Sequence, residues 1–244
     1  MAKCFRSLVY EHDYSLPEVD SPIEDPVLIH AVHAHVEKYL GRIATTLHEL
    51  HSHYVHVDVH VVAPGPSRDF YTLVTSGMSA APMRAQVGEE SALVYAELML
   101  CLPPDWPIDL CNGKMLTRDA TVVWPIELLV ELARMPHEFD TWLAAGHTVS
   151  LERERVGFTR FRSALMLPPA AEPPAFWKLP VVATGSPERE VNFLSVLLLD
   201  ARETRFKLEH GLEELLVRLQ DAQVSDLLEP YRPCAVRRRL EACG

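Results

Sequence analysis

The sequence predicts a single α/β domain of the α+β kind, in which helices pack on a mixed β-sheet. Segments with helical hydrophobic spacing and segments with strand-like spacing are interleaved along the chain, a pattern typical of mixed folds. Residues 191–199 are apolar on both faces, as expected of a central strand. No fixed repeat period is present, which argues against a solenoid. A chain of 244 residues with 48% hydrophobic content is long enough to bury a sizeable core.

The first predicted element is a long helix over residues 26–50. Asp25 can cap its N-terminus, and Pro26 suits the first helical turn. Apolar residues then recur every three or four positions, as on the buried side of a helix. They are Leu28, Val32, Val36, Tyr39, Ile43, Leu47 and Leu50. This spacing predicts one continuous amphipathic helix.

Three strands are predicted next, over residues 54–62, 70–75 and 92–102. In the first strand, valines at the odd positions 55 to 61 alternate with His56, Asp58 and His60, so the two sets face opposite sides. Residues 77–88 are rich in small and turn-forming residues and form a loop. Neighbouring strands joined in this way are expected to pair antiparallel.

The second half of the chain predicts further helices and strands. A helix opens at Trp124, is broken at Pro136, and continues as a shorter helix that ends before Gly146. Strands follow over 158–167 and 191–199, and one amphipathic helix covers 204–220. The proline-rich stretch 168–180 is expected to be a surface loop.

The charge and composition restrict the classes of partner. A formal net charge of −11 repels phosphate backbones, so nucleic acid is not expected as a partner, whereas a basic protein is. No run of 18 apolar residues exists, so no membrane span is expected. The N-terminal residues carry no signal-peptide pattern. Five cysteines without a C-x-x-C pair fit a reducing compartment, so the expected location is the cytoplasm.

Histidines are concentrated between residues 30 and 60, which raises the possibility of a metal site. On the first helix, His30, His33 and Glu37 have the spacing of a zinc-binding set, and His48 and His51 follow on nearly the same face. On the first strand, His56, Asp58 and His60 project together and could hold an ion with a ligand from elsewhere.

In both cases the preferred interpretation is an ordinary polar face. We therefore predict no metal and no cofactor. His56, Asp58 and His60 remain the candidate ligands of the alternative function, a metal-dependent hydrolase.

No catalytic motif is found. The segment from Gly77 to Ala81 has Ser79 after a strand, but a nucleophile elbow needs glycine where Ala81 stands, and Pro82 follows where a helix should run. Phosphate-binding glycine loops and cysteine-nucleophile signatures are also absent from the sequence. We therefore expect the protein not to be an enzyme.

Four stretches stand in a specific order and spacing. They are YVHVDVHVVAPGPSRDFYTLVTSGMSAAPM (54–83), YAELMLCLPPDW (95–106), WPIELLVELAR (124–134), and VNFLSVLLLD with GLEELLVRL (191–200 and 211–219). Together they resemble the suppressor-of-fused domain family, and more closely its short bacterial members than the longer animal protein. The resemblance implies a family domain over residues 25–220, an N-terminal extension over 1–24 and a C-terminal tail over 221–244.

The resemblance also implies a function without catalysis. Many bacterial members of the family look like immunity proteins of polymorphic toxin systems, which bind and block a cognate toxin. A basic toxin domain would suit the acidic charge of this chain. The candidate contacts are the loop residues Gly77, Met78, Ser79 and Met83, the His56, Asp58 and His60 row, and the helix residues Glu209, Glu213 and Glu214. A general scaffold or regulatory binding module remains the other alternative.

Overall fold

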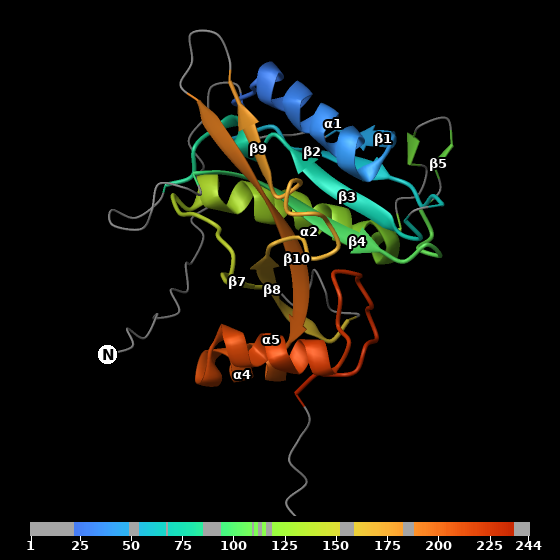
Figure 1. Ribbon diagram of the computed structural model, residues 1–244, viewed down its shortest axis with the longest axis vertical. Helices are drawn as coiled ribbons and strands as arrows, with labels where there is room; N and C mark the ends of the chain where they lie inside the picture. The colour runs from blue at the N-terminus through green and yellow to red at the C-terminus, as the bar shows by residue number, and fades with distance from the viewer. Residues whose placement is uncertain are drawn as a thin grey trace, which may run out of the picture.

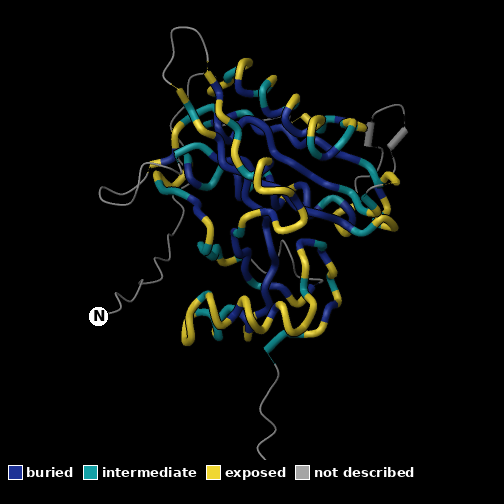
Figure 2. The backbone as a smooth tube through the Cα atoms, viewed as in Figure 1, coloured by how far each residue is buried: buried dark blue, intermediate teal, exposed yellow. Residues whose placement is uncertain are grey.

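A long strand, β10 (Arg189–Asp200), organises the molecule in the computed structural model. The structure describes residues 22–48, 54–66, 68–84, 94–108, 110–111, 114–115, 119–151, 159–182 and 188–236. On one side β10 pairs in parallel with β4 (Tyr95–Leu102). On the other side it pairs antiparallel with β8 (Phe161–Leu167) and β9 (Lys178–Val181). Its residues from Val191 to Asp200 are all buried (Figure 2), which confirms the predicted central strand.

The main sheet has eight strands in the order β1-β2-β3-β4-β10-β8-β7, with β9 beside β10. The strands not yet named are β1 (Ile43–Leu47), β2 (Asp58–Val62), β3 (Tyr71–Ser76) and β7 (Thr148–Ser150). The pairs β2–β3 and β3–β4 are antiparallel, as predicted. β1, which was not predicted, also pairs antiparallel with β2. A separate hairpin joins β5 (Leu110–Cys111) and β6 (Lys114–Met115). The predicted mixed sheet in a single α+β domain is confirmed.

Four helices among the described residues cover the two faces of this sheet (Figure 1). They are α1 (Pro26–Leu40), α2 (Ala120–Glu138), α4 (Ala201–His210) and α5 (Leu212–Asp221). Successive side chains of β10 point to opposite faces of the sheet. On one face, Leu194, Val196 and Leu198 join the core under α2. On the other face, Phe193 joins the core under α1, while Leu197 and Leu199 pack with α5. None of these helices combines the length and apolar character that a membrane crossing requires.

The helix predicted over residues 26–50 is wrong in its second half. α1 ends at Leu40, because Gly41 has a φ of 104°, which takes the chain out of the helix. Ile43 to Leu47 then form β1 at the edge of the sheet. Spacings of four residues suit both elements, so Ile43 and Leu47 fitted the helical pattern by coincidence, while β-branched Thr45 and Thr46 favour the strand.

Two other helix predictions are corrected. α2 runs through both Pro125 and Pro136 and ends at Glu138, so Pro136 neither breaks a helix nor starts another. Pro136 lies in the last turn, so only two helical residues follow the backbone hydrogen bond that its missing N–H omits. The helix predicted over 204–220 is two helices, since Gly211, with a φ of 92°, separates α4 from α5. α4 begins earlier than predicted because Asp200 and Glu203 form a capping box.

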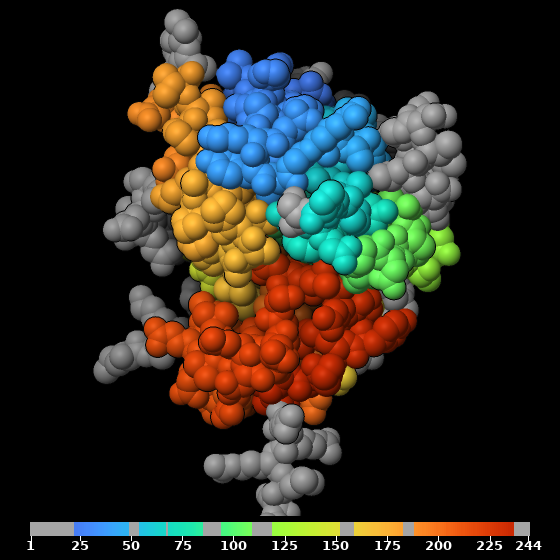
Figure 3. Space-filling view, turned by 45° about the vertical axis from the view of Figure 1, so that its right-hand side comes forward, coloured from blue at the N-terminus to red at the C-terminus, as the bar shows by residue number. Residues whose placement is uncertain are grey.

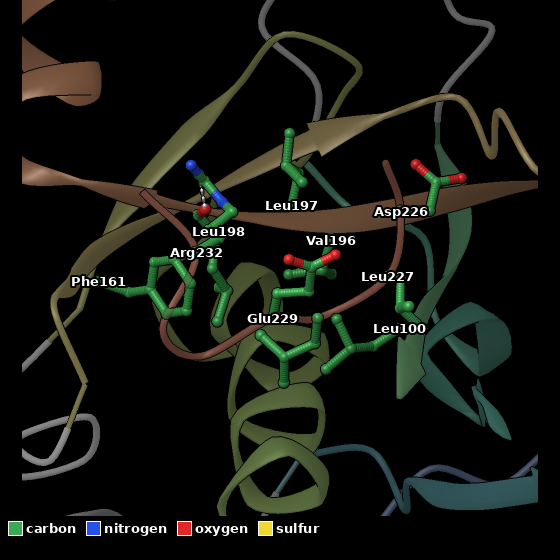
Figure 4. Close-up of a pocket in the computed structure, with 10 residues that line it drawn as sticks. Leu100, Phe161, Val196, Leu197, Leu198, Asp226, Leu227, Glu229 and Arg232 are labelled. Carbon is green, nitrogen blue, oxygen red and sulfur yellow. Dashed lines mark hydrogen bonds between the residues drawn. The ribbon is translucent and has the colours of Figure 1, made fainter. Parts of the chain in front are cut away.

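Residues 222–236, in the segment predicted to be a tail, lie against the sheet in the structure. The backbone N–H of Leu228 donates to the Cys101 carbonyl across 2.8 Å, so this segment pairs in parallel beside the end of β4, beyond the residues that pair with β10. Figure 3 shows the segment in red between α4–α5 and the upper part of the molecule. Further along this segment, the guanidinium group of Arg232 donates a hydrogen bond to the Leu198 backbone oxygen at 2.9 Å (Figure 4). The cavity enclosed there measures about 10 Å³, which is no more than one water needs.

Candidate functional site

The loop that follows β3 is held from beneath by one buried carboxylate. Glu97 of β4 has no exposed surface. Its Oε2 accepts the hydroxyl of Thr75 at 2.6 Å. Its Oε1 accepts the backbone N–H of Gly77 at 3.0 Å, and both the N–H at 3.0 Å and the hydroxyl at 2.6 Å of Ser79. Four donors therefore fix the Thr75–Ser79 segment on a single side chain.

The geometry of this loop requires glycine at position 77. Gly77 has a φ of 118°, in the region that residues with side chains rarely adopt. A Cβ atom there would lie 1.9 Å from the backbone oxygen of His56. The backbone of the loop therefore passes directly over the segment that enters β2, and no larger residue fits without moving it.

The environment of Glu97 suits a structural role. Burial raises the pKa of this carboxyl above its ordinary value, while the hydrogen bonds from Ser79, Thr75 and Gly77 act in the opposite direction. Among the described residues, the donors to Glu97 are Thr75 at the end of β3 and Gly77 and Ser79 of the loop. The carboxylate is thus occupied in positioning the loop and has no face open to a ligand.

On its outer side the same loop borders a small groove. The groove has a volume of about 240 Å³ and is lined by Ile23, Tyr54, Val55, Ala81, Pro82, Arg84, Pro136, His137 and Asp140. Ile23 is 51% exposed although it is a large apolar residue. Arg84 and Asp140 form an ion pair at the rim. We take this groove as the candidate partner-binding site, because a rigid apolar hollow with a polar rim is the usual anatomy of a protein contact.

His137 connects the loop to α2 behind the groove. Its Nε2 lies 3.0 Å from the backbone oxygen of Met78, within hydrogen-bond distance. Burial lowers the pKa of His137, and the bond to Met78 acts in the opposite direction. The neutral imidazole, with its hydrogen on Nε2, can donate to this carbonyl and so hold the loop against the helix.

The four predicted partner contacts lie inside the structure. Gly77, Met78, Ser79 and Met83 are all buried. A direct contact of their side chains with a partner stays a prediction, and it would require the loop to open. The more accessible positions of the segment, half-buried Ala81 and exposed Pro82, were not singled out from the sequence, because nothing in the local pattern distinguishes them.

The polar row of the first predicted strand is divided by the structure. His60 is buried; its Nδ1 lies 2.9 Å from the Thr46 hydroxyl and its ring meets that of His33 edge-on at 5.4 Å. Burial and the nearby His33 lower the pKa of His60 to about 4. His56 and Asp58 instead lie together with His48, which was predicted to be helical. The three predicted candidates therefore do not form one group.

Other predicted or possible ligand sets are occupied by internal contacts. Asp200, Glu203 and Cys234 are close enough to share an ion. However, both oxygens of Glu203 accept from Arg232, at 2.6 and 2.7 Å, and Asp200 caps α4. On α1, His33 and Glu37 are half-exposed and 4.0 Å apart, while His51 lies outside the described residues.

A second surface with exposed apolar residues lies on the helix pair at the other end of the molecule. Glu209, Glu213 and Glu214 are exposed there, as predicted for solvated helix faces. Leu208 and Val217 are also exposed. A hollow of about 1070 Å³ separates this pair from residues 233–236. Its lining reaches Val236, the last residue that the structure describes, so we assign it no ligand.

The comparison with protein families gives one match. Residues 53–233 match the family model described as "Suppressor of fused protein (SUFU)". That range includes the loop, its Glu97 support, and all of the groove except Ile23. No curated protein sequence matches the chain.

Solved structures show the same fold. A protein described as a SUFU homolog from Neisseria gonorrhoeae FA 1090 matches with a TM-score of 0.60 and 18% identity, over 86% of this chain and 98% of that one. A chain of the Sufu–Fu complex matches with a TM-score of 0.59 and 14% identity, over 87% and 93%. Drosophila Suppressor of Fused matches with a TM-score of 0.50 and 13% identity, over 74% of this chain and 42% of that one. At these identities the structures establish the fold alone.

Proposed function

The chain belongs to the suppressor of fused family, and on that premise we propose that it acts as a protein-binding domain, more specifically as an immunity protein that neutralises a cognate toxin. One of the related structures is a complex between Sufu and Fu. A binding role needs a surface that is already formed before the partner arrives, and the groove beside the Thr75–Ser79 loop meets that need.

The observation that carries the proposal is the exposed Ile23 on a rigid groove wall. In a protein interface a few residues supply most of the binding energy, and an exposed apolar side chain in a hollow is a typical residue of this kind. Ala81 and Pro82 line the same groove, and Glu97 fixes the loop that leads to them. Such preformed surfaces lose little conformational entropy on binding.

The charge of the chain indicates the class of partner. A net charge of −11 raises the rate of encounter with a basic protein and repels acidic ones. Toxins that cleave nucleic acids need basic surfaces to bind phosphates. We therefore propose a basic toxin domain as the partner. Cys101 and Cys234 are free thiols, in keeping with an interaction in the cytoplasm.

Co-expression tests this proposal. The chain is expressed in a bacterial host with the toxin encoded beside it in its own genome, and growth and co-purification are measured. We expect growth to be restored and a stable complex to be recovered. Growth arrest without a complex would contradict the immunity role.

Substitution of two exposed apolar residues distinguishes the groove from the α4–α5 surface as the binding site. Ile23→Arg adds a charge to the groove, and Leu208→Arg adds the same charge to the surface of α4. We expect Ile23→Arg to weaken the complex at least tenfold, which corresponds to about 1.4 kcal/mol, and Leu208→Arg to leave it unchanged. Weakening by Leu208→Arg and not by Ile23→Arg would place the partner contact on α4–α5, without contradicting the immunity role.

A further inference from the structure

Three ligand-type side chains converge at the open end of the β1–β2 pair. His48 Nδ1 lies 2.9 Å from Oδ2 of Asp58, and His56 Nε2 lies 2.9 Å from Oδ1 of the same carboxylate. One ligand atom from each residue falls within 4.8 Å of the other two. From this arrangement we propose that His48, His56 and Asp58 form a binding site for one divalent ion of the zinc class, independently of the partner-binding groove.

The strand register builds this site. β1 and β2 are antiparallel, and Leu47 pairs with Val59, so the next positions along the two chains, His48 and Asp58, stand opposite each other. Cross-strand neighbours project to the same face about 4.5–5.5 Å apart. His56 lies two residues before Asp58, which directs it to the same side in extended chain. Two backbone segments thus present three ligands without any special loop.

The hydrogen bonding of Asp58 leaves room for an ion. Its Oδ1 is buried and accepts no hydrogen bond from the described residues, although His56 Nε2 is 2.9 Å away. A buried carboxylate oxygen without a donor is costly. A cation bound by this oxygen and the two imidazoles would remove the cost, since ligands contact a metal through lone pairs and not through N–H groups.

The ligand types select the ion. Two imidazole nitrogens and one carboxylate oxygen favour Zn²⁺ and similar transition ions over Mg²⁺ or Ca²⁺, which prefer oxygen ligands alone. In a tetrahedral zinc site the ligand atoms stand about 3.3 Å apart. The 2.9 Å separations here need only a small widening. A water molecule would complete the coordination.

The burial of the three residues permits entry of an ion and limits its movement. The Asp58 side chain is 10% exposed and that of His56 is 21% exposed, whereas that of His48 is 70% exposed. The buried pair therefore fixes the base of the site, and His48 can turn to admit the ion. His60, His33 and Glu37 are close neighbours of this site, and His60 is engaged with Thr46.

The test uses the full chain, purified without a histidine tag, stripped of metal, and titrated with ZnCl₂ by calorimetry. We expect one Zn²⁺ per chain with micromolar affinity and a rise in melting temperature that follows occupancy. Co²⁺ in place of Zn²⁺ should give the visible absorption of a four-coordinate site. The main variant is His48→Gln, because this exposed side chain is not needed for folding. The matched control is His30→Gln, an exposed histidine on α1.

His48→Gln should lower the Zn²⁺ affinity at least tenfold and abolish the thermal shift, while His30→Gln should change neither. Asp58→Asn should do the same as His48→Gln, and its circular dichroism spectrum checks that it folds. No stoichiometric Zn²⁺ binding, or equal binding by wild type and His48→Gln, would overturn the proposal. Loss of zinc binding without loss of toxin protection would leave the function proposed above untouched.

Discussion

Glu97 and Ser79 meet through two hydrogen bonds on one carboxylate oxygen, from the backbone N–H at 3.0 Å and from the hydroxyl at 2.6 Å. Glu97 belongs to β4, and Ser79 belongs to the short 3₁₀ turn η1 (Met78–Ala80), 18 residues earlier in the chain. This contact ties the loop beside the candidate groove to the sheet. Its strength therefore determines how rigid that groove is.

Removal of the carboxylate should unfold the loop or the whole domain. Glu97→Ala leaves the N–H groups of Gly77 and Ser79 buried without acceptors, and each unsatisfied buried donor costs about 1–3 kcal/mol. We expect a loss of about 3–5 kcal/mol in the free energy of unfolding, measured with urea. Ser79→Ala removes one hydroxyl and should cost about 1 kcal/mol. Equal stability of Glu97→Ala and wild type would contradict this role.

The pH dependence of stability should reveal the buried charge. Burial raises the pKa of Glu97 above the ordinary value of 4.5, so the folded state holds this proton more tightly than the unfolded state. The contribution of Glu97 to stability is therefore fully present below the unfolded pKa and is lost as the pH rises through the folded pKa.

Glu97→Gln isolates this effect, since the amide has the same shape without the charge. The difference in unfolding free energy, wild type minus Glu97→Gln, should fall as the pH rises above 4.5. Urea unfolding of both proteins at several pH values measures it. A difference that stays constant with pH would show that Glu97 has the same pKa in both states.

A methyl group at position 77 should disturb the fold more than at other glycines. Gly77→Ala combines a positive φ with a Cβ atom 1.9 Å from the His56 oxygen. We expect a loss of at least about 2 kcal/mol, because the backbone must shift as well as bear strain. Gly41→Ala, with a φ of 104° and no atom within 4 Å, should show the cost of strain alone. Gly65→Ala, which has neither problem, should be close to neutral. The order Gly77, Gly41, Gly65 in decreasing cost is the testable result.

The strand predictions were confirmed where the spacing of the apolar residues fitted a strand and no other element. The valines from Val55 to Val61 alternate strictly with polar residues, and all four are fully buried under α2. β10 was found because a run apolar on both faces fits only a central strand. Its neighbours could not be read from the sequence, since pairing with β4 and β8 depends on contacts between residues about 100 and 30 positions apart, which local patterns do not encode.

The ligand set near Asp58 was missed for a local reason. His48 was assigned to a helix because Ile43 and Leu47 continued the spacing of α1, and this placed it far from the strand. Gly41 was the signal that separates the two elements, since glycine after a helical stripe is a common helix end. Once the chain turns there, the antiparallel register brings His48 opposite Asp58. His60, which has the same alternation as Asp58, pairs with Thr46 for the same reason.

The two described thiols should differ from an exposed cysteine in reactivity. Burial raises the pKa of Cys101 to about 12, and burial together with the Asp200 carboxylate raises that of Cys234 to about 11. The thiolate is the reactive form, so neither should react with iodoacetamide in the folded protein near neutral pH. Peptide mapping by mass spectrometry should show label on both only after unfolding. Rapid labelling of Cys101 in the native protein would mean that β4 and residues 226–228 separate readily.

Arg232 should hold the C-terminal segment on the sheet. It is 7% exposed and forms two parallel hydrogen bonds with Glu203, which has no exposed surface. Removing one partner of a buried pair leaves the other charge uncompensated, at a cost of about 3–5 kcal/mol. We therefore expect Arg232→Met to lower the unfolding free energy by this amount. Arg202→Met, at an arginine that is largely exposed beside Asp200, should cost less than about 1 kcal/mol.

A double-mutant cycle separates the pair from the packing around it. Glu203 also accepts the backbone N–H groups of Asp200 on Oε2 and of Ala235 on Oε1, at 2.9 and 2.8 Å, and the single oxygen of an amide can still accept one of them. Glu203→Gln combined with Arg232→Met should therefore be more stable than the sum of the single losses predicts, by at least about 1 kcal/mol, because no unpaired charge remains. Additive losses would mean that the two side chains stabilise the segment separately, and that Arg232 acts through its contacts with Leu198 and Phe161 instead.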